Sequence, residues 1–348
     1  MKQKLSETIA ALSEWYRKCA KPLPWRLDPS PYHVWISEIM LQQTRIEAVI
    51  PYYERFLAEL PDVSSLAEVD DERLMKLWQG LGYYSRARNL KRAAMRIMEH
   101  HGGALPADFA ALRALPGIGD YTAGAIASIA FGLPEPAVDG NVMRVLTRIL
   151  ADDTDIAKPA AKQKFIAPLR EVYPSGDAAR LASEALMELG EQICIPNGAP
   201  KCERCPAAQL CEAHRLGLES ELPVKSAKAA RRVEICTILL LTQNGRYAIR
   251  RRPDKGLLAG LWEFPSLPGA ADEDAIAEFL TRENLTHVGN VHALGNAKHI
   301  FTHVEWHMTG LSVEVSGEPE SLIFASPEEL REVYAIPTAF RAYTSQIL

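Results

Sequence analysis

The chain has 348 residues and a formal net charge of −5 at pH 7, and hydrophobic residues occupy 47% of its positions. This length exceeds one typical hydrophobic core and predicts two domains. The sequence has no signal-peptide core and no apolar run long enough to cross a membrane, which predicts a cytoplasmic protein. The acidic balance excludes a protein that holds nucleic acid by bulk charge, so any such contact must come from local patches.

The N-terminal region predicts two helices separated by a Pro-rich loop. Apolar residues recur at helical spacing at Leu5, Ile9, Leu12 and Tyr16. That spacing predicts a surface helix over residues 4–18 with one buried side. The loop contains Trp25 and Arg26, and a second helix is expected over residues 31–44 because Trp35, Ile36, Ile39 and Met40 make an apolar stripe.

Glu38 lies at the edge of that apolar stripe, beside Trp35. Apolar surroundings disfavour an ionised carboxyl group, and a carboxyl that stays protonated can act as a general acid. A lone Glu at such a boundary is more often an exposed surface residue. The sequence around Glu38 must decide between the two interpretations.

A longer stretch, residues 115–146 (LPGIGDYTAGAIASIAFGLPEPAVDGNVMRVL), joins a glycine hairpin to a helix of small residues and then to Asp139. Gly117 and Gly119 allow backbone angles that a Cβ forbids, so successive N–H groups can point at one phosphate oxygen. A plain connection between two helices has a similar sequence. Asp139 precedes another helix, where N–H donors keep it ionised and where it also fits an ordinary N-cap.

These segments resemble a known family. The hairpin with Asp139-Gly140-Asn141-Val142 resembles the helix-hairpin-helix DNA glycosylases, and SEIMLQQT at 37–44 closely resembles the MutY-type adenine DNA glycosylases. The resemblance implies that Glu38 protonates the adenine and that Asp139 acts on the sugar. It implies that the adenine is surrounded by Trp25, Arg26, Leu41 and Glu184, and that catalysis is supported by Tyr121 and Asn141. It also implies that the DNA is wedged by Gln42, Gln43 and Thr44, and that the DNA backbone is held by Gly117 and Gly119.

The segment LWQGLGYYSRAR at 77–88 is similar to another stretch of the same family. By that resemblance, Leu81 and Tyr83 approach the damaged guanine opposite the adenine, and Arg86 contacts DNA. A Tyr pair flanked by glycines and positive charge also suits unstacking of bases on physical grounds. A buried turn of the core is the simpler interpretation and accounts for Trp78 and Tyr84.

Two carboxyl groups with opposite protonation states predict hydrolysis of a glycosidic bond. Adenine leaves once a ring nitrogen is protonated, and a carboxylate stabilises the cation-like sugar that remains. The base must first be flipped out of the stack. Tyr121 stands where the endonuclease III type carries a Lys that forms a Schiff base. Because a phenol cannot form that imine, we expect a monofunctional glycosylase that leaves the abasic site intact.

A cluster of cysteines follows at Cys194, Cys202, Cys205 and Cys211. Four thiols in so short a span of a cytosolic protein indicate a metal site rather than disulfides. Structural zinc with four thiolates is compatible with this spacing. The C-x2-C-x5-C run resembles the loop of these glycosylases that holds one [4Fe-4S] cluster. The family usually has six residues between the first two cysteines, whereas this chain has seven, Ile195 to Lys201. Cys19 and Cys236 are expected to be buried apolar residues.

The C-terminal third changes to strand periodicity after a polar linker. Strands are expected at 234–241, 247–252, 261–267 and 300–308, with a helix at 272–280. The order and GLLAGLWEFP at 256–265 resemble the MutT-like domain of adenine glycosylases. No REx2EExG-type acidic box follows Gly260, so we expect lesion recognition rather than nucleotide hydrolysis. The resemblance implies that Phe301, Thr302 and His303 match a Phe-Ser-His loop at the oxidised guanine, although a simple strand turn also fits.

Together these observations predict an α+β multidomain protein. The helical helix-hairpin-helix domain covers 1–216, with the hairpin motif at about 112–131 and the iron-sulfur loop at 194–211. A linker covers 217–231, and a MutT/Nudix-like α/β domain covers 232–348. The expected activity is removal of adenine opposite 8-oxoguanine or guanine in duplex DNA, by a cytoplasmic monomer of bacterial type. The alternatives are an endonuclease III-like pyrimidine-lesion glycosylase, a DNA damage-binding protein without catalysis, and a Nudix-type hydrolase.

Overall fold

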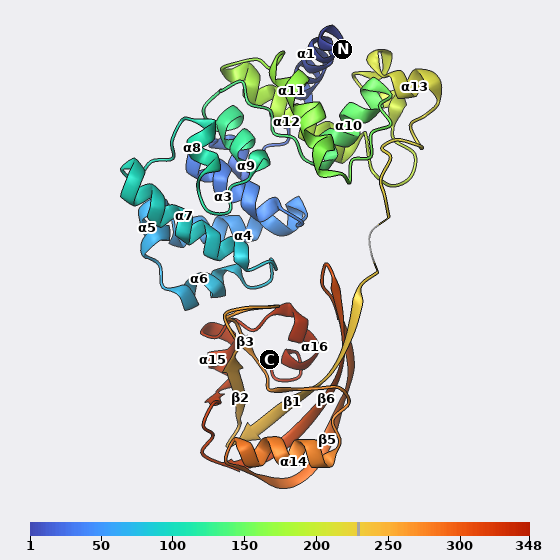
Figure 1. The fold of residues 1–348 in the computed structure, drawn as a ribbon. Coiled ribbons are helices and arrows are strands. Elements are labelled where there is room, and N and C mark those ends of the chain that lie inside the picture. The colour runs from blue at the N-terminus through green and yellow to red at the C-terminus, as the bar shows by residue number, and fades with distance from the viewer. Residues whose placement is uncertain (228–229) are drawn as a thin grey trace. The chain divides into compact units, whose positions relative to one another are not determined.

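The computed structural model describes residues 1–227 and 230–348 and divides the chain into two compact units (Figure 1). The first unit contains Met1–Glu68 and Asn89–Ala227. The second contains Val69–Arg88 together with the described residues from 230 onward. Residues 228–229 of the predicted linker lie outside the described residues. Among the helices of the described ranges, none is long and apolar enough to cross a membrane.

Helices make up the first 216 residues. Their bounds are α1 Lys2–Cys19, α2 Pro24–Leu27, α3 Pro31–Leu41, α4 Ile46–Glu59, α5 Val63–Glu68, α6 Asp71–Trp78, α7 Ser85–His101, α8 Phe109–Arg113, α9 Asp120–Ala125, the π-helix η1 Ile126–Ala130, α10 Gly140–Leu150, α11 Pro159–Arg170, α12 Asp177–Gln192, the 3₁₀ turns η2 Cys202–Arg204 and η3 Ala208–Leu210, and α13 Glu212–Leu216. Of these, α6 and the start of α7 belong to the second unit.

The apolar stripe of α1 packs into a core that α10, α11 and α12 share. Leu5, Leu12 and Tyr16 of α1 are buried there with residues of the three later helices. This confirms the helix predicted over residues 4–18, because its apolar positions are those that lose contact with water. The helix predicted over 31–44 is too long, since α3 ends at Leu41 and residues 42–44 form a turn.

A mixed sheet forms the C-terminal part. Its strands are β1 Arg232–Gln243, β2 Arg246–Arg251, β3 Trp262–Glu263, β4 Ser266–Pro268, β5 Leu285–Ile300, β6 Val304–Gly317 and β7 Ile323–Ala325, and its helices are α14 Glu273–Arg282, α15 Pro327–Glu332, η4 Thr338–Phe340 and α16 Arg341–Thr344. The strand order is β3-β2-β1-β6-β5, with β4 paired to β1 and β7 to β2. Strands β1 and β6 are parallel, and the other pairs are antiparallel.

The continuous apolar run of β1 supplies both faces of this sheet. Ile238 and Leu240 pack with residues of α15 and α16, whereas Leu239 and Leu241 pack with residues of α14. Side chains alternate between faces along a strand, so a strand buried on both sides must be apolar throughout. Figure 1 shows α14 lying along the sheet, which confirms the helix predicted at 272–280.

Two predicted strands are wrong in part. The strand expected over 300–308 is a hairpin, because β5 ends at Ile300 and β6 begins at Val304. Phe301–His303 make the connection between them, so the turn interpretation of these residues is confirmed. The strand expected over 261–267 is divided into β3 and β4, with Phe264 and Pro265 between them. Proline lacks the N–H that a ladder needs, which accounts for the interruption.

Neither cysteine outside the cluster is fully buried. Cys19 is exposed at the end of α1, so the prediction of a buried residue is wrong there, and Cys236 on β1 is half-buried. The apolar stripe of α1 ends at Tyr16, three residues earlier. Cys19 lies beyond this stripe, as the last residue of α1.

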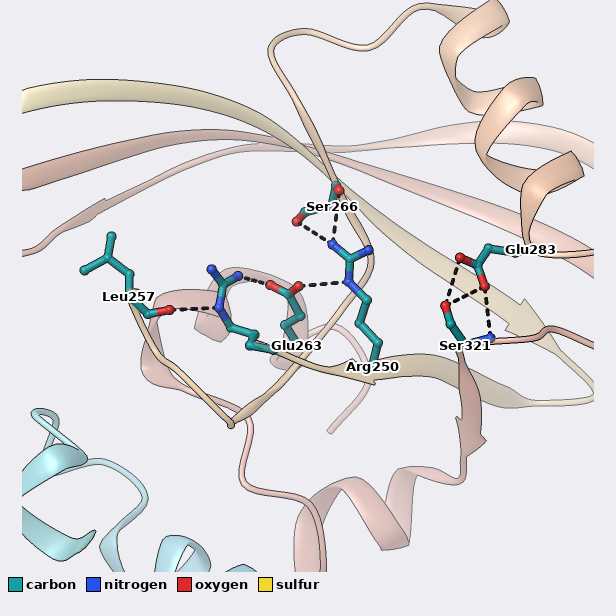
Figure 2. A network of polar contacts seen from close by, with 7 residues as sticks. Arg250, Leu257, Glu263, Ser266, Glu283 and Ser321 are labelled. Atoms are coloured by element: carbon teal, nitrogen blue, oxygen red, sulfur yellow. Dashed lines mark hydrogen bonds and ion pairs between the residues drawn. The ribbon is translucent and has the colours of Figure 1, made fainter. Parts of the chain in front are cut away.

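Figure 2 shows a network of polar contacts beside β2 and the edge strand β3. Glu263 is buried, and its Oε1 accepts a hydrogen bond from Arg250 Nε at 2.9 Å while its Oε2 pairs with Arg252. Arg252 also donates from Nε to the Leu257 carbonyl at 2.9 Å. Both oxygens of the only acidic residue in the GLLAGLWEFP segment are therefore occupied by arginines.

Residues 69–88 join the second unit through hydrogen bonds to backbone carbonyls. Lys76 Nζ donates to the carbonyls of Leu330 and Tyr334, each at 3.2 Å, and Gln79 Nε2 donates to the Ile336 carbonyl at 2.8 Å. Burial lowers the pKa of Lys76 to about 8. These contacts fix the loop that follows α6 and carries Tyr83.

Candidate active site

Glu38 lies inside the protein, in the middle of α3. The helix starts at Pro31, and the preceding Ser30 caps it by accepting a hydrogen bond from the His33 N–H at 3.3 Å. Glu38 is only 6% exposed, which decides between the two interpretations of its position in favour of a buried carboxyl. The predicted stripe residue Trp35, at 0% exposure, is buried on the same helix.

Burial raises the pKa of Glu38 to about 7. A hydrogen bond with Tyr121 and the charge of Arg26 oppose this rise, while the charges of Asp139 and Glu184 add to it. A substantial fraction of Glu38 is therefore protonated at neutral pH, as a general acid requires. Five residues that the sequence analysis singled out therefore interact around this carboxyl group: Glu38, Tyr121, Arg26, Asp139 and Glu184.

The glycine hairpin connects α8 to α9 and depends on one glycine more than on the other. Gly117 has φ of +76°, and a Cβ there would lie 2.5 Å from Asn89 Cβ. Gly119 has φ of −93° and open space around it, so any residue could adopt its conformation. The prediction that backbone freedom requires glycine is confirmed at Gly117 and wrong at Gly119.

The small residues after the hairpin let the chain leading to Asp139 approach α9 closely. A Cβ on Gly124 would lie 2.6 Å from the Pro136 carbonyl oxygen, so only glycine permits this contact. The contact packs the segment before Asp139 against the helix that carries Tyr121. Sequence analysis did not identify Gly124, and its only signal was its place in a run of small residues.

Asp139 is the N-cap of α10 and accepts three hydrogen bonds. Its Oδ1 accepts from the backbone N–H groups of Asn141 at 2.9 Å and Val142 at 2.8 Å, and its Oδ2 accepts from Asn141 Nδ2 at 3.0 Å. These donors fix the position of the Asp139 side chain. The N-cap interpretation is confirmed, and the half-buried carboxylate remains close enough to Glu38 to influence it.

Tyr121 lies at the start of α9 and interacts with both carboxyl groups, Glu38 and Asp139. Burial raises the pKa of Tyr121 well above its usual range, and the charges of Glu38 and Asp139 add to that rise. Its hydroxyl lies 3.8 Å from the Met187 sulfur on α12. The phenol is therefore a neutral hydrogen-bonding group at the site.

The residues expected around the base occupy α2, the end of α3 and α12. Trp25 is buried and packs edge to face on Tyr53, with the ring centroids 5.3 Å apart. Burial raises the pKa of Glu184, against the opposing charge of Arg26. Leu41 is half-buried at the end of α3. Arg26 and Glu184 therefore belong to the same charged group as Glu38, and Trp25 precedes Arg26 in α2.

The predicted wedge residues form a turn anchored to α9. Gln43 is exposed and has a backbone φ of +65°, a conformation that residues other than glycine adopt rarely. Gln42 Nε2 donates to Thr122 Oγ1 at 3.4 Å, and the Thr44 N–H donates to the Leu41 carbonyl at 3.2 Å. The turn thus presents Gln43 outward from a fixed base.

A second group of predicted residues lies within the second unit. Tyr83 is 50% exposed with φ of +47°, and its hydroxyl is 3.0 Å from Thr302 Oγ1 in a hydrogen bond. Thr302 and His303 are exposed in the hairpin turn, and the Phe301 ring packs 4.9 Å from the ring of Trp306. The loop of residues 79–84 and the β5-β6 turn therefore meet through two hydroxyl groups.

Arg86 supports the loop that carries Tyr83. It is buried, and its Nη2 donates to the carbonyls of Leu81 at 3.0 Å and Gly82 at 3.1 Å. Its guanidinium carbon lies 5.2 Å from the centroid of the Trp78 ring, and burial lowers its pKa to about 10. Leu81 is itself buried. The expected contact of Arg86 with DNA stays a prediction, and its support of the loop is a role that sequence analysis missed.

The four cysteines of the loop at 194–211 line one pocket. Cys194 follows α12, Cys202 begins η2, Cys205 follows η2, and Cys211 is the N-cap residue of α13. The other lining residues include Val145, Ile149, Leu189 and Ile193. The extra residue between the first two cysteines is absorbed in a bend that closes where the Lys201 N–H donates to the Ile193 carbonyl at 3.0 Å. Four thiols around an apolar cavity fit a thiolate-ligated metal or cluster.

Two buried arginines of α10 contact this pocket, and one of them, Arg144, also reaches Asn141 beside Asp139. Arg144 donates from Nε to the Cys194 carbonyl at 2.8 Å and from Nη1 to Asn141 Oδ1 at 2.9 Å. Arg148 donates from Nη1 to Cys194 Sγ at 3.3 Å. Sequence analysis missed both, although two arginines four residues apart on an otherwise apolar helix face were a signal for buried charge.

The chain matches two family models and several curated relatives. A model of the HhH-GPD superfamily of base excision DNA repair proteins matches residues 36–171, and a NUDIX domain model matches residues 236–346. The adenine DNA glycosylase of Homo sapiens is 33% identical over 97% of this chain and 74% of its own length. The adenine DNA glycosylase of Schizosaccharomyces pombe is 31% identical, over 84% of this chain and 78% of its own.

Solved structures agree with the fold of the helical part. A thermostable thymine-DNA glycosylase is 26% identical with a TM-score of 0.55, over 62% of this chain and 98% of that protein. A non-covalent endonuclease III-DNA complex shares the fold with a TM-score of 0.52 at 22% identity, over 63% of this chain and 98% of that one. The predicted family, fold class and enzyme class are confirmed. The chain belongs to the adenine DNA glycosylase family and is an N-glycosylase of base excision repair, with a helical HhH-GPD domain followed by a Nudix-like α/β domain.

Proposed function

We propose that this adenine DNA glycosylase removes adenine paired with 8-oxoguanine or guanine in duplex DNA and leaves the DNA strand uncut. The observation that carries the proposal is the pairing of a buried carboxyl with a hydrogen-bonded carboxylate. Glu38 has a pKa raised to about 7 by burial, and Asp139 accepts three hydrogen bonds at the start of α10. Two carboxyl groups in such different surroundings take opposite roles in glycoside chemistry.

The reaction begins when Glu38 donates its proton to a ring nitrogen of the flipped adenine. The bond between that base and the sugar C1′ then breaks, and its electron pair leaves with the base. The ionised Asp139 stabilises the cation-like sugar. Water adds to C1′, and its proton returns to the Glu38 carboxylate, which restores the acid for the next turnover. Tyr121 and Asn141 hold the two carboxyl groups in place.

Strand cleavage is not part of the proposed reaction. A lyase needs an amine that attacks C1′ and forms an imine, and this site presents the neutral phenol of Tyr121 beside Glu38 and Asp139. We therefore assign a monofunctional reaction, in contrast to the endonuclease III type of enzyme.

Recognition of the base opposite the adenine belongs, in this proposal, to Tyr83, Leu81 and the turn at Phe301–His303. Support comes from the hydrogen bond of 3.0 Å between the hydroxyl groups of Tyr83 and Thr302 and from the exposure of both residues. Exposed aromatic and hydroxyl groups can stack on a base and read its edge. The DNA backbone is held by the hairpin at Gly117 and Gly119 and by the turn at Gln42–Thr44.

One [4Fe-4S] cluster is the proposed occupant of the cysteine pocket. Cys194, Cys202, Cys205 and Cys211 would hold it, and it would cross-link the loop between α12 and α13 rather than react with substrate. Because the ligand atoms of Cys202, His214 and Glu219 lie within 4.8 Å of one another, zinc is the competing occupant. Iron and sulfide analysis with visible absorption distinguishes the two, and zinc found in place of iron would contradict this assignment.

The proposed domain limits are 1–216 for the catalytic part, 217–231 for the linker and 232–348 for the lesion-reading part. We propose that the protein acts as a monomer on nucleoid DNA in the cytoplasm. The size of the particle in solution, measured by light scattering, tests the monomer.

A strand-break assay tests the proposed function. The protein is incubated with duplexes that carry one adenine opposite 8-oxoguanine, guanine or thymine, and breaks are measured with and without hot alkali. We expect breaks only after alkali and only in the two mispaired duplexes. Breaks without alkali would overturn the monofunctional assignment, and equal reaction with the A·T duplex would overturn the proposed substrate.

A further inference from the structure

Glu188 is a buried acid that the proposed mechanism does not use. It lies on α12 with no exposed side-chain surface, and its Oε2 accepts a hydrogen bond from Arg26 Nη2 at 2.6 Å. Its Oε1 is 3.7 Å from the half-exposed Lys21 Nζ. A carboxylate removed from water is costly unless a cation is fixed beside it. Glu188 and Arg26 therefore form a buried ion pair between α2 and α12.

The pair leaves one end of Arg26 free. Arg26 Nη1 is buried and has no hydrogen-bond partner among the described residues. The guanidinium carbon lies 5.4 Å from the centroid of the Tyr16 ring, so an aromatic face and a carboxylate together fix the plane of the group. A buried donor without a partner costs free energy, and such a cost is commonly tolerated where a ligand completes the bond.

Arg26 also lies within the charged group around Glu38. Its positive charge opposes the raised pKa of Glu38 and that of Glu184, which lies one helical turn before Glu188. Burial disfavours the charged form of Arg26, but Tyr16 and Glu188 outweigh it, so the pKa of Arg26 lies above its usual value. The guanidinium thus remains charged at every pH at which the enzyme works.

We propose that Glu188 is a positioning residue of the adenine site, which holds Arg26 so that the unpaired Nη1 donates a hydrogen bond to an acceptor nitrogen of the flipped base. The inference rests on the proposed function, because it assumes that adenine enters the pocket beside Glu38. Glu188 acts through Arg26 and touches no substrate atom. A planar guanidinium that is fixed by one carboxylate loses little freedom when its other edge binds a base.

The test compares Glu188→Gln with Glu191→Gln on a duplex with adenine opposite 8-oxoguanine. Glu191 is an exposed acid on the same helix, so its substitution controls for the change of charge. We expect the single-turnover rate of adenine release to fall about 100-fold in Glu188→Gln, the usual loss from a misplaced contact, and to stay near wild type in Glu191→Gln. Binding to a duplex with an abasic analogue in place of adenosine should be unchanged in both, because that duplex does not use the base pocket.

A double variant tests whether Glu188 works through Arg26. If it does, Arg26→Gln combined with Glu188→Gln should release adenine no more slowly than Arg26→Gln alone. Losses that multiply in the double variant would overturn the proposal. Weaker binding of the abasic-analogue duplex by Glu188→Gln would also overturn it, since Glu188 would then support the fold in general.

The wild-type protein separates this inference from the proposed function. If wild type releases no adenine from the mispaired duplex, the proposed function fails. If wild type is active and Glu188→Gln is equally active, only the positioning role of Glu188 fails.

Discussion

The proposed catalytic group around Glu38 and the proposed lesion-reading group at Tyr83 and Thr302 are built in opposite ways. Glu38 is 6% exposed, and its surroundings change its protonation, whereas Tyr83 is 50% exposed and meets Thr302 through a hydrogen bond at the surface. Proton transfer depends on a carboxyl that water does not solvate, so the catalytic group must be buried. Reading a base requires groups that stay accessible to DNA. The difference predicts large effects from changes in the first group and modest effects in the second.

Asp139→Asn should give the largest loss among changes outside Glu38. Asparagine still caps a helix, but it carries no charge to stabilise the cation-like sugar. We expect adenine release to slow by about 10²- to 10³-fold, which is typical for loss of electrostatic stabilisation. Single-turnover kinetics on the duplex with adenine opposite 8-oxoguanine measure the effect.

Asp108→Asn is the matched control. Asp108 caps α8 by accepting a hydrogen bond from the Ala111 N–H at 2.7 Å, so the same substitution alters a cap away from the catalytic group. An equal loss of rate in both variants would mean that Asp139 is only a cap.

The pH dependence of the rate tests the buried state of Glu38. Burial raises its pKa to about 7, and the protonated form is the active one, so activity is present at low pH and lost as pH rises through that value. We expect the single-turnover rate to fall about tenfold per pH unit on the alkaline side. Binding to an abasic-analogue duplex, measured over the same range, controls for loss of DNA contact. A rate that stays flat from about pH 6 to 9 would contradict this role of Glu38.

Thr302→Val should have a smaller effect, confined to the base opposite the adenine. The substitution removes the hydroxyl that meets Tyr83 and keeps the shape of the side chain. We expect the preference for 8-oxoguanine over guanine to fall by about 10-fold or less, the worth of one hydrogen bond. Relative rates on the two mispaired duplexes measure it. Thr286→Val, an exposed threonine on β5, serves as the control, and an equal change in both variants would speak against a reading role.

Gly117→Ala should have its main effect on stability rather than on chemistry. With φ of +76° and Asn89 in the way, alanine is strained there, and we expect the free energy of unfolding to fall by about 1–3 kcal/mol. Gly119→Ala, at φ of −93° with open space, should change it little. Denaturant unfolding of the two variants measures the difference. Equal losses would contradict the distinction between the two glycines.

Much of the catalytic group could be predicted from sequence because its residues lie in local motifs. Glu38 in SEIMLQQT and Asp139 before Gly140 each have a recognisable setting. The contacts of Glu188 and Arg144 could not be predicted, since they depend on partners, Arg26 and Cys194, that only the packing of helices brings near. Contacts between residues far apart in the chain leave little trace in one sequence.

Contacts between distant residues also limited the prediction of the strands. Alternation at 300–308 predicted one strand, and the burial of Val304, Trp306 and Met308 confirms half of it. The turn at Phe301–His303 contains no glycine or proline, so residue types could not decide between a turn and a continuous strand there. Register with β5 and β1, rather than local sequence, decides where β6 begins.

Glu38→Gln tests the central claim, that a buried and protonated carboxyl starts the reaction. The amide keeps the size of the side chain but has no proton to give at neutral pH. Adenine release and DNA binding are measured together on the duplex with adenine opposite 8-oxoguanine, with Glu54→Gln on α4 as an exposed control. We predict binding at the wild-type affinity and a rate lower by about 10²- to 10⁴-fold. Turnover near that of wild type would contradict the account.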